Sequence, residues 1–463
     1  MILEREQSSF RDNKATVFFS SDRIFRKIIK SLNIDYDKLL SSNFFKENKN
    51  KIVSTKILNA HDLNELNLKE DNEVVWLEHE KLENIIYPYE LTFDQLKDYS
   101  IFFLDLYINA LKNSYDIIDA SAYNIQSKNN LPIFIDLGSF TEHRNDKHIT
   151  WHKQFCENFL APLLIKSKAK INFNDFFKAN IDGIDLKIAS KILPLSTWFN
   201  YNILINIHLH SYLNSKISSS TKLSRVSKKN LKIRQKIFIA ESLKKTISKL
   251  LIKKSSYWSS YSKINSYSDN DYAKKSKLIS NFIKNEKINS LLDLGCNDGY
   301  FSKVSFDNGV KKVVGVDYDL DSLNEAYLKF KNSSKNFLAI YQNFTNTSPD
   351  MGWMGEERKS FLKRFKNKFD GIICLAFIHH ICIGKNVPLE QFIDYIGNFS
   401  KNVLLEFVSS EDSMVKNLSA NKENLLDSYT IENLRKIIKK KNTIISENQI
   451  TATRFLIHYK NEI

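Results

Sequence analysis

The chain has 463 residues, and at roughly 150 residues per domain this length predicts two or three domains. Hydrophobic residues make up 42% and charged residues 26% of the sequence, which excludes a disordered or fibrous chain. The net charge of +15 raises the question of a polyanionic partner, but the excess is mostly lysine among many Asn and Ile residues, so nucleic acid is disfavoured.

The sequence predicts a cytoplasmic protein with reduced thiols. Its four cysteines form no CxxC pair and no spacing typical of metal ligands, so we expect neither a disulfide framework nor a bound metal. The N-terminus carries Glu4, Arg5 and Glu6 where a signal peptide needs an apolar run. No stretch has 18 apolar residues without polar interruption, so we expect no membrane span. Nothing in the sequence indicates the oligomeric state.

The N-terminal half contains a pattern typical of phosphoryl transfer. Residues 74–82 predict a strand and hinge, and residues 92–114 predict an amphipathic helix. Asp119 and Asn124 follow in the pattern D-x-x-x-x-N, and a strand-turn-strand segment then leads to Asp136 in D-L-G. In kinase-like folds the first Asp positions the phosphate acceptor, while the Asn and the second Asp hold Mg²⁺. The arrangement resembles the catalytic loop of atypical kinases, which implies Mg-ATP as a cofactor if this half is catalytic.

Three interpretations of the N-terminal half stay open, namely an active phosphotransferase, a kinase-like fold that binds substrate or has a structural role, and coincidence. No glycine precedes Gly138, which excludes a Gly-rich phosphate loop. A catalytic lysine is hard to identify, with Lys27 and Lys56 as the options. The kinase-like fold without catalysis is the favoured interpretation.

Residues 214–287 shift in composition to Lys, Ser and Asn, which predicts a domain boundary. From Ile288 onward short apolar strands alternate with helical segments, which predicts a doubly wound, mainly parallel sheet. The first strand ends in the glycine-rich turn DLGCNDG at residues 293–299, and the second ends at Asp317, about 20 residues beyond the turn. At that spacing a carboxylate can accept hydrogen bonds from both hydroxyls of a ribose. A dinucleotide site would require GxGxxG, but Asn297 stands at its middle glycine.

The segments LLDLGCNDGYFS and VVGVDYD resemble the first two motifs of class I S-adenosylmethionine-dependent methyltransferases. SPDMGWMGEER, LAFIHHICIGKNVPLEQF and LLEFVSSED are similar to one bacterial branch of that family, whose members are labelled as nodulation proteins and have a similar N-terminal half. The resemblance implies a class I Rossmann-like α/β sheet, preceded by an α+β kinase-like domain. It also implies that NTIISENQ and TRFLIHYK form a closing antiparallel pair.

The resemblance implies S-adenosylmethionine as cofactor. It places Asp293 and Gly295 near the methionine end, Asp317 on the ribose and Asn343 near the adenine, where the family commonly has an acid. The full set of implied cofactor-binding residues is Asp293, Gly295, Cys296, Asn297, Gly299, Asp317, Tyr318 and Asn343.

On the acceptor side, the resemblance places residues that face the methyl group after the fourth strand, where His379 and His380 stand. Methyl transfer needs alignment above all, plus a base if the nucleophile carries a proton, and histidine suits that role. We favour His380 slightly and expect at least one of the pair to pack against the following helix. Glu406 is a candidate to bind the acceptor or orient a histidine, with a surface cap as its alternative. Trp353 lies in an insert where acceptor-binding lids lie, and either stacks on substrate or closes a local core.

These features predict an S-adenosylmethionine-dependent methyltransferase acting on a small molecule or a glycan precursor. One alternative is a bifunctional enzyme with an ATP-dependent phosphotransferase domain. The other is an RNA methyltransferase, suggested only by the positive charge and disfavoured because a (D/N)PP(Y/F/W) tetrad is absent. The expected domains are a kinase-like domain at 1–213, a basic helical connector at 214–254 and a methyltransferase domain at 255–463. The resemblance implies that the aromatic residues from Tyr257 to Tyr267 belong to a helix that precedes the first strand and covers the cofactor, while packing in the core is the favoured alternative for an aromatic stripe.

Overall fold

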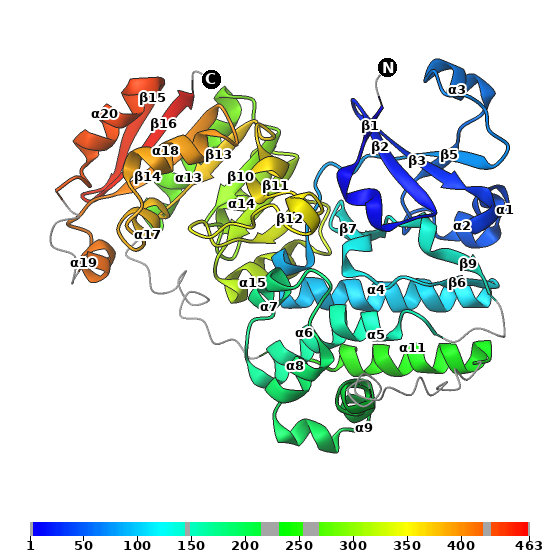
Figure 1. The fold of residues 1–463 in the computed structure, drawn as a ribbon. Helices are drawn as coiled ribbons and strands as arrows, with labels where there is room; N and C mark the ends of the chain where they lie inside the picture. The colour runs from blue at the N-terminus through cyan, green and yellow to red at the C-terminus, as the bar shows by residue number, and fades with distance from the viewer. Residues whose placement is uncertain (1–2, 144–148, 214–230, 253–267, 420–426, 462–463) are drawn as a thin grey trace. The chain divides into compact units, whose positions relative to one another are not determined.

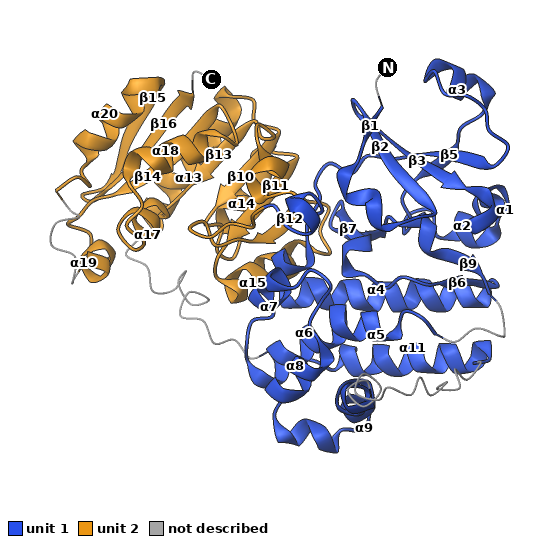
Figure 2. Cartoon of the chain, viewed as in Figure 1, with its two compact units in different colours: residues 1–253, 350–358 blue, residues 254–349, 359–463 orange. Residues whose placement is uncertain are grey.

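The computed structural model describes residues 3–143, 149–213, 231–252, 268–419 and 427–461. The chain forms two compact units, shown in two colours in Figure 2. Unit 1 consists of Met1–Lys253 and Asp350–Arg358, and unit 2 consists of Lys254–Pro349 and Lys359–Ile463. The aromatic segment from Tyr257 to Tyr267 lies outside the described residues.

Unit 1 begins with an antiparallel sheet of five strands in the order β1-β2-β3-β5-β4, drawn in blue in Figure 1. An apolar cluster that includes Phe25, Leu58 and Trp76 packs against it. The strand expected at residues 74–82 is confirmed as β5. The strands are β1 (Glu4–Arg5), β2 (Ala15–Ser20), β3 (Arg23–Ile29), β4 (Thr55–Ile57) and β5 (Val74–His79), and the helices of this part are η1 (Gln7–Arg11), η2 (Lys30–Leu32), α1 (Tyr36–Ser41), α2 (Asn43–Glu47) and α3 (Ala60–Glu65).

The rest of unit 1 is mainly helical. The predicted amphipathic helix is α4 (Phe93–Lys112), which begins at a capping box between Thr92 and Gln95. The predicted strand-turn-strand is the hairpin of β7 (Ile125–Lys128) and β8 (Leu131–Phe134). The remaining elements are η3 (Pro88–Glu90), β6 (Tyr115–Ile117), η4 (Ala122–Asn124), η5 (Leu137–Ser139), β9 (Phe140–Glu142), α5 (His152–Phe155), η6 (Cys156–Leu160), α6 (Ala161–Leu164), η7 (Ile165–Ala169), α7 (Asn174–Ala179), α8 (Leu186–Ile192), η8 (Leu195–Phe199), α9 (Tyr201–Ile203), η9 (Leu204–Leu209) and α11 (Ile233–Ser248).

Helix α11 belongs to unit 1, although the sequence predicts a connector at residues 214–254. It runs beside α4 (Figure 1). Lys236 is fully buried, and its ammonium donates to the Asp116 carboxylate at 2.7 Å. A buried and paired lysine is a packing contact and not a solvated helical face. The first unit therefore continues to Lys253 and does not end at residue 213.

Residues 350–358 also belong to unit 1, although they follow the third strand of the second unit's sheet in sequence. The Glu357 carboxylate accepts two hydrogen bonds from Arg11, at 2.7 and 2.9 Å. The Arg358 guanidinium lies 4.0 Å from the centre of the Tyr123 ring. Trp353 is exposed, so it does not close a local core.

Unit 2 contains a seven-stranded sheet in the order β12-β11-β10-β13-β14-β16-β15. The first five of these strands are parallel, and β16 is antiparallel to both β14 and β15. The mainly parallel sheet and its antiparallel closing pair confirm the sequence-based expectation. The strands are β10 (Ser290–Leu294), β11 (Lys312–Asp317), β12 (Asn336–Tyr341), β13 (Gly371–Cys374), β14 (Asn402–Val408), β15 (Asn442–Thr451) and β16 (Arg454–Asn461).

Helices alternate with these strands, and three of them share one core with the sheet through residues such as Ile279, Phe306 and Leu323. Because β10 and β13 are neighbours while β11 and β12 lie on the other side of β10, the strand order reverses at β10. Ligands of such sheets bind beyond the carboxyl ends of the strands at this reversal. The helices are α13 (Asp269–Asn285), α14 (Tyr300–Asp307), α15 (Leu320–Phe330), η11 (Trp353–Gly355, assigned to unit 1), α16 (Phe361–Phe365), α17 (Ile378–Cys382), α18 (Leu389–Gly397), α19 (Ser413–Ser419) and α20 (Ile431–Lys441). Among the described residues, no helix combines the length and apolar composition needed to cross a bilayer.

Candidate active site

The turn after β10 is held close to the end of β13. Gly295 has φ +78° and its N–H donates to the Val316 carbonyl at 2.8 Å. A Cβ at Gly295 would lie 2.8 Å from Cδ2 of Phe377, so only glycine fits between the turn and this ring. Gly299 has φ +74° and begins α14. The two glycines thus allow the turn that the sequence predicts.

Asp317 ties the ends of the first two strands together. One carboxylate oxygen accepts the Asn297 N–H at 2.7 Å, and the other accepts the Asp319 N–H at 2.8 Å. Desolvation raises the pKa of Asp317 to about 6, although both backbone hydrogen bonds oppose the shift. The side chain remains partly exposed, and each carboxylate oxygen can accept a further hydrogen bond. Asp317 can therefore meet the hydroxyls of a ligand from the place predicted.

Two other residues of the first motif face inward. Asp293 is buried, and its carboxylate accepts the Ser302 hydroxyl at 2.6 Å. Burial raises the pKa of Asp293 to about 7. The thiol of Cys296 lies in the apolar core, and its backbone N–H donates to the Val316 carbonyl. Cys296 therefore supports the turn through its packing and its backbone hydrogen bond. Asp293 supports it from the buried side through its hydrogen bond to Ser302.

The residues that follow the second and third strands differ in how accessible they are to a ligand. Tyr318 is largely exposed, and its ring stacks on that of Tyr341 with centroids 6.0 Å apart. The amide oxygen of Asn343 accepts the N–H and the hydroxyl of Thr345, at 3.1 and 2.8 Å. This local turn already engages the oxygen expected to meet the adenine. The exposed ring of Tyr318 is thus the more available surface for a flat ligand.

His379 and His380 lie in α17 and differ in exposure. Their ring centroids are 4.1 Å apart. His379 is fully buried, neither of its ring nitrogens has a hydrogen-bond partner among the described residues, and desolvation holds its pKa well below the usual value. His380 is partly exposed, and desolvation together with the positive charge of Arg454 lowers its pKa to about 4. His379 is therefore the packed member of the pair, and His380 is the one that solvent reaches.

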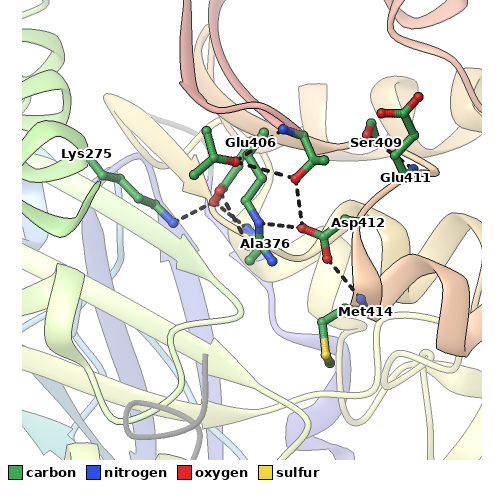
Figure 3. Close-up of polar contacts among 10 residues, drawn as sticks. Lys275, Ala376, Glu406, Ser409, Glu411, Asp412 and Met414 are labelled. Atoms are coloured by element: carbon green, nitrogen blue, oxygen red, sulfur yellow. Dashed lines mark hydrogen bonds and ion pairs between the residues drawn. The ribbon is translucent and has the colours of Figure 1, made fainter. Parts of the chain in front are cut away.

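Glu406 lies inside unit 2 and supports the loop that precedes these histidines. One oxygen of its fully buried carboxylate accepts the Lys275 ammonium at 2.6 Å and the Ala376 N–H at 2.9 Å (Figure 3). Ala376 has φ +49°, which costs energy for a residue other than glycine and persists only where neighbours hold it. The structure thus corrects two expectations, since Glu406 is neither a surface cap nor exposed to an acceptor. It acts through the backbone of the fourth-strand loop.

A second buried ion pair continues this network. The Arg454 Nε donates to the Asp412 carboxylate at 2.9 Å, and its guanidinium lies 3.8 Å from the other oxygen of Glu406. The second oxygen of Asp412 accepts the Met414 N–H at 3.0 Å (Figure 3). Sequence reasoning missed both Lys275 and Arg454. One signal was present, because Lys275 stands four residues before Ile279 on the buried face of α13.

In unit 1 the structure brings the kinase-like residues together with an unexpected arginine. Desolvation and the charge of Asp136 raise the pKa of Asp119, and the Asn124 carbonyl accepts the N–H of the residue before Asp136. The Arg26 guanidinium lies 2.6 Å from the Asp136 carboxylate. Lys56 instead pairs with Glu78 at 3.1 Å. Lys27, the other option, is exposed on β3.

The chain is similar over nearly its whole length to one characterised sequence. It is 31% identical over 456 residues to nodulation protein NoeA of Rhizobium meliloti (strain 1021), and the match covers 97% of this chain and 94% of that protein. No family model matches the chain.

Among solved structures, the chain is similar to WbdD with 18% identity and a TM-score of 0.29, covering 41% of this chain and 40% of WbdD. N-methyltransferase NodS from Bradyrhizobium japonicum WM9 has 12% identity and a TM-score of 0.30, covering 42% and 97% of the two chains. Magnesium protoporphyrin IX methyltransferase ChlM from Synechocystis PCC 6803 with bound SAH has 14% identity and a TM-score of 0.30, covering 42% and 84%.

Proposed function

The chain belongs to the family of nodulation protein NoeA, and we propose that its second unit is an S-adenosylmethionine-dependent methyltransferase acting on a small molecule or a glycan precursor. The observation that carries this proposal is the position of Asp317, which ends β11 beside the Gly295 turn where the strand order reverses.

The four cysteines are free and buried, which supports the cytoplasm as the compartment.

The residues of the turn fit the cofactor. The partly exposed Asp317 carboxylate binds the ribose hydroxyls, and the exposed ring of Tyr318 packs on the adenine. Gly295 and Gly299 keep the turn free of side chains that would fill the space beside it. When bound, S-adenosylmethionine supplies an activated methyl group on a sulfonium.

The acceptor meets the fourth-strand loop. His380 is neutral at pH 7 because its pKa is about 4, so a lone pair on its imidazole can take a proton from the acceptor. Glu406 and Lys275 are positioning residues, which hold the loop through the Ala376 N–H. Alignment of the acceptor by this rigid loop is the main requirement of an in-line transfer.

Calorimetric titration of the full chain with S-adenosylmethionine, S-adenosylhomocysteine, NAD and Mg-ATP tests the cofactor. We expect the two adenosyl compounds to bind to wild type and to bind at least tenfold more weakly to Asp317→Ala. The matched control is Asp298→Ala, which removes a carboxylate of the same turn that pairs with Lys329. Binding of NAD in place of the adenosyl compounds would contradict the proposal.

We also propose that unit 1 has a kinase-like fold without phosphotransferase activity. The order of a five-stranded sheet, a long helix, the Asp119 loop, a hairpin and Asp136 supports the fold. The lack of activity is supported by the Arg26 guanidinium, which occupies a side of the Asp136 carboxylate that a metal ion would need. The positive charge of Arg26 neutralises the Asp136 carboxylate without a metal ion.

Mg-ATP titration and turnover separate this proposal from the bifunctional alternative. We expect no Mg-dependent ATP hydrolysis by wild type and no change in S-adenosylmethionine affinity in Asp136→Ala. Mg-dependent turnover that disappears in Asp136→Ala would establish two working sites and overturn the proposal.

A further inference from the structure

An exposed apolar surface lies on the helical part of unit 1, and the proposed activities make no use of it. It consists of Leu195, Trp198, Phe199, Tyr201, Leu209 and Tyr212, and is here called the 195–212 surface. Phe199 is 91%, Leu195 80% and Tyr201 74% exposed. Soluble helices normally present polar residues to water, and a group of large exposed apolar side chains marks a binding surface.

The 195–212 surface is held in place by buried contacts beneath it. The ring of His208 is buried, and its two nitrogens lie 2.8 and 2.9 Å from the hydroxyls of Ser190 and Thr197. Because the Thr197 hydroxyl donates to the Pro194 carbonyl at 2.6 Å, it accepts from His208 Nε2, and His208 Nδ1 accepts from Ser190. The Trp198 ring stacks on His208 with centroids 4.2 Å apart. The apolar side chains are therefore presented by an ordered scaffold.

The sequence around the 195–212 surface has an excess of positive charge. The described residues between 186 and 240 contain five Lys or Arg residues and no Asp or Glu, and four of these five are exposed, namely Lys187, Lys191, Lys232 and Arg234. The chain as a whole has 53 acids in 463 residues, a frequency that would place about four among the described residues of this stretch. Lys187 and Lys191 of α8 carry this charge on the element that leads into the 195–212 surface. An acid-free, basic region beside exposed Trp, Tyr, Phe and Leu side chains is complementary to an anionic, partly apolar partner.

We propose that the 195–212 surface binds the interface of a membrane that contains anionic phospholipids. Leu195 and Phe199 enter the boundary between headgroups and acyl chains, and Trp198 and Tyr201 lie at headgroup level. The flanking lysines contact the lipid phosphates. The attachment is peripheral and reversible, because it uses a small apolar surface and a few charges. This inference goes beyond the proposed methyl transfer and does not depend on it.

Sedimentation of the full chain with lipid vesicles tests the proposal. We expect binding to vesicles of phosphatidylcholine with about one quarter phosphatidylglycerol, weaker binding when salt is raised to about 0.5 M, and no binding to pure phosphatidylcholine. The double variant Leu195→Ser/Phe199→Ser should reduce vesicle binding at least tenfold. Its circular dichroism spectrum and its urea unfolding midpoint should equal those of wild type, which checks that the variant folds.

Leu131→Ser is the matched control, because Leu131 is also exposed but lies in the β7–β8 hairpin outside the region. It should bind vesicles as wild type does. Absence of binding to anionic vesicles at low salt overturns the proposal, as does equal binding by wild type and the double variant. Self-association of wild type that the double variant loses, without vesicle binding, would assign the surface to a second copy of the chain.

Discussion

The ammonium of Lys275 lies 2.6 Å from the carboxylate of Glu406, and both side chains are excluded from solvent. The same ammonium lies 4.6 Å from the centre of the Phe301 ring. Desolvation lowers the pKa of Lys275 from its ordinary value, and Glu406 opposes that shift. Each charge is therefore held in the core by the other, and the Ala376 turn depends on the pair.

We predict that Glu406→Gln destabilises the protein by about 3–5 kcal/mol, because it leaves the Lys275 charge buried without its partner. The double variant Glu406→Gln/Lys275→Met should recover much of that loss. Urea unfolding followed by circular dichroism measures both. Lys303→Met is the control, since Lys303 and Asp307 form an exposed pair whose loss should leave the free energy of unfolding nearly unchanged. A similar cost for both single variants would contradict a special role for the buried pair.

Asp293 gives stability a defined pH dependence. Its pKa is about 7 in the folded chain and near 3.8 in an ordinary environment, so between these values only the folded state keeps the proton. The contribution is fully present below about pH 4 and is lost as the pH rises through 7, to a total of about 4 kcal/mol. We expect Asp293→Asn to remove this slope because an amide does not titrate, and its oxygen can still accept the Ser302 hydroxyl. Thermal unfolding from pH 4 to 8 measures it, and parallel profiles for the two proteins would contradict the raised pKa.

Cofactor affinity should depend on the ionisation of Asp317. Its pKa is about 6, and the protonated carboxyl group offers fewer acceptors to the ribose hydroxyls. We expect the affinity for S-adenosylmethionine to be constant above about pH 7 and to fall as the pH is lowered through 6. Calorimetry at four pH values checks this pH dependence. Asp317→Asn should bind S-adenosylmethionine weakly, with an affinity that does not change with pH. A wild-type affinity that is flat from pH 5 to 8 would refute the ribose assignment.

His380 should affect turnover more than binding. We predict that His380→Ala lowers methyl transfer at least tenfold while S-adenosylmethionine affinity changes less than about twofold. Transfer of a labelled methyl group into a protein-free small-molecule extract provides the assay. At saturating cofactor, the acid limb of the pH profile should lie near pH 4, the value of the His380 pKa. Equal losses of binding and turnover would make His380 a structural residue.

The elements of unit 2 could be predicted because local patterns encode them. Short apolar strands, a glycine turn and an acid at the next strand end are readable within about 30 residues. The Lys275–Glu406 pair could not be read this way, since 131 residues separate its partners, and Arg26 and Asp136 are 110 apart. The sequence does not reveal that α11 belongs to unit 1 for the same reason, because the partner of Lys236 lies 120 residues earlier in the chain.

Unit 1 is discontinuous in sequence, since it takes Glu357 and Arg358 from a segment encoded within the second unit. A gene cut after residue 253 therefore yields a first fragment without residues 350–358. In that fragment Arg11 lacks the Glu357 carboxylate, and the Tyr123 ring lacks the Arg358 guanidinium. The second fragment in turn carries the nine residues 350–358 that belong to the first unit.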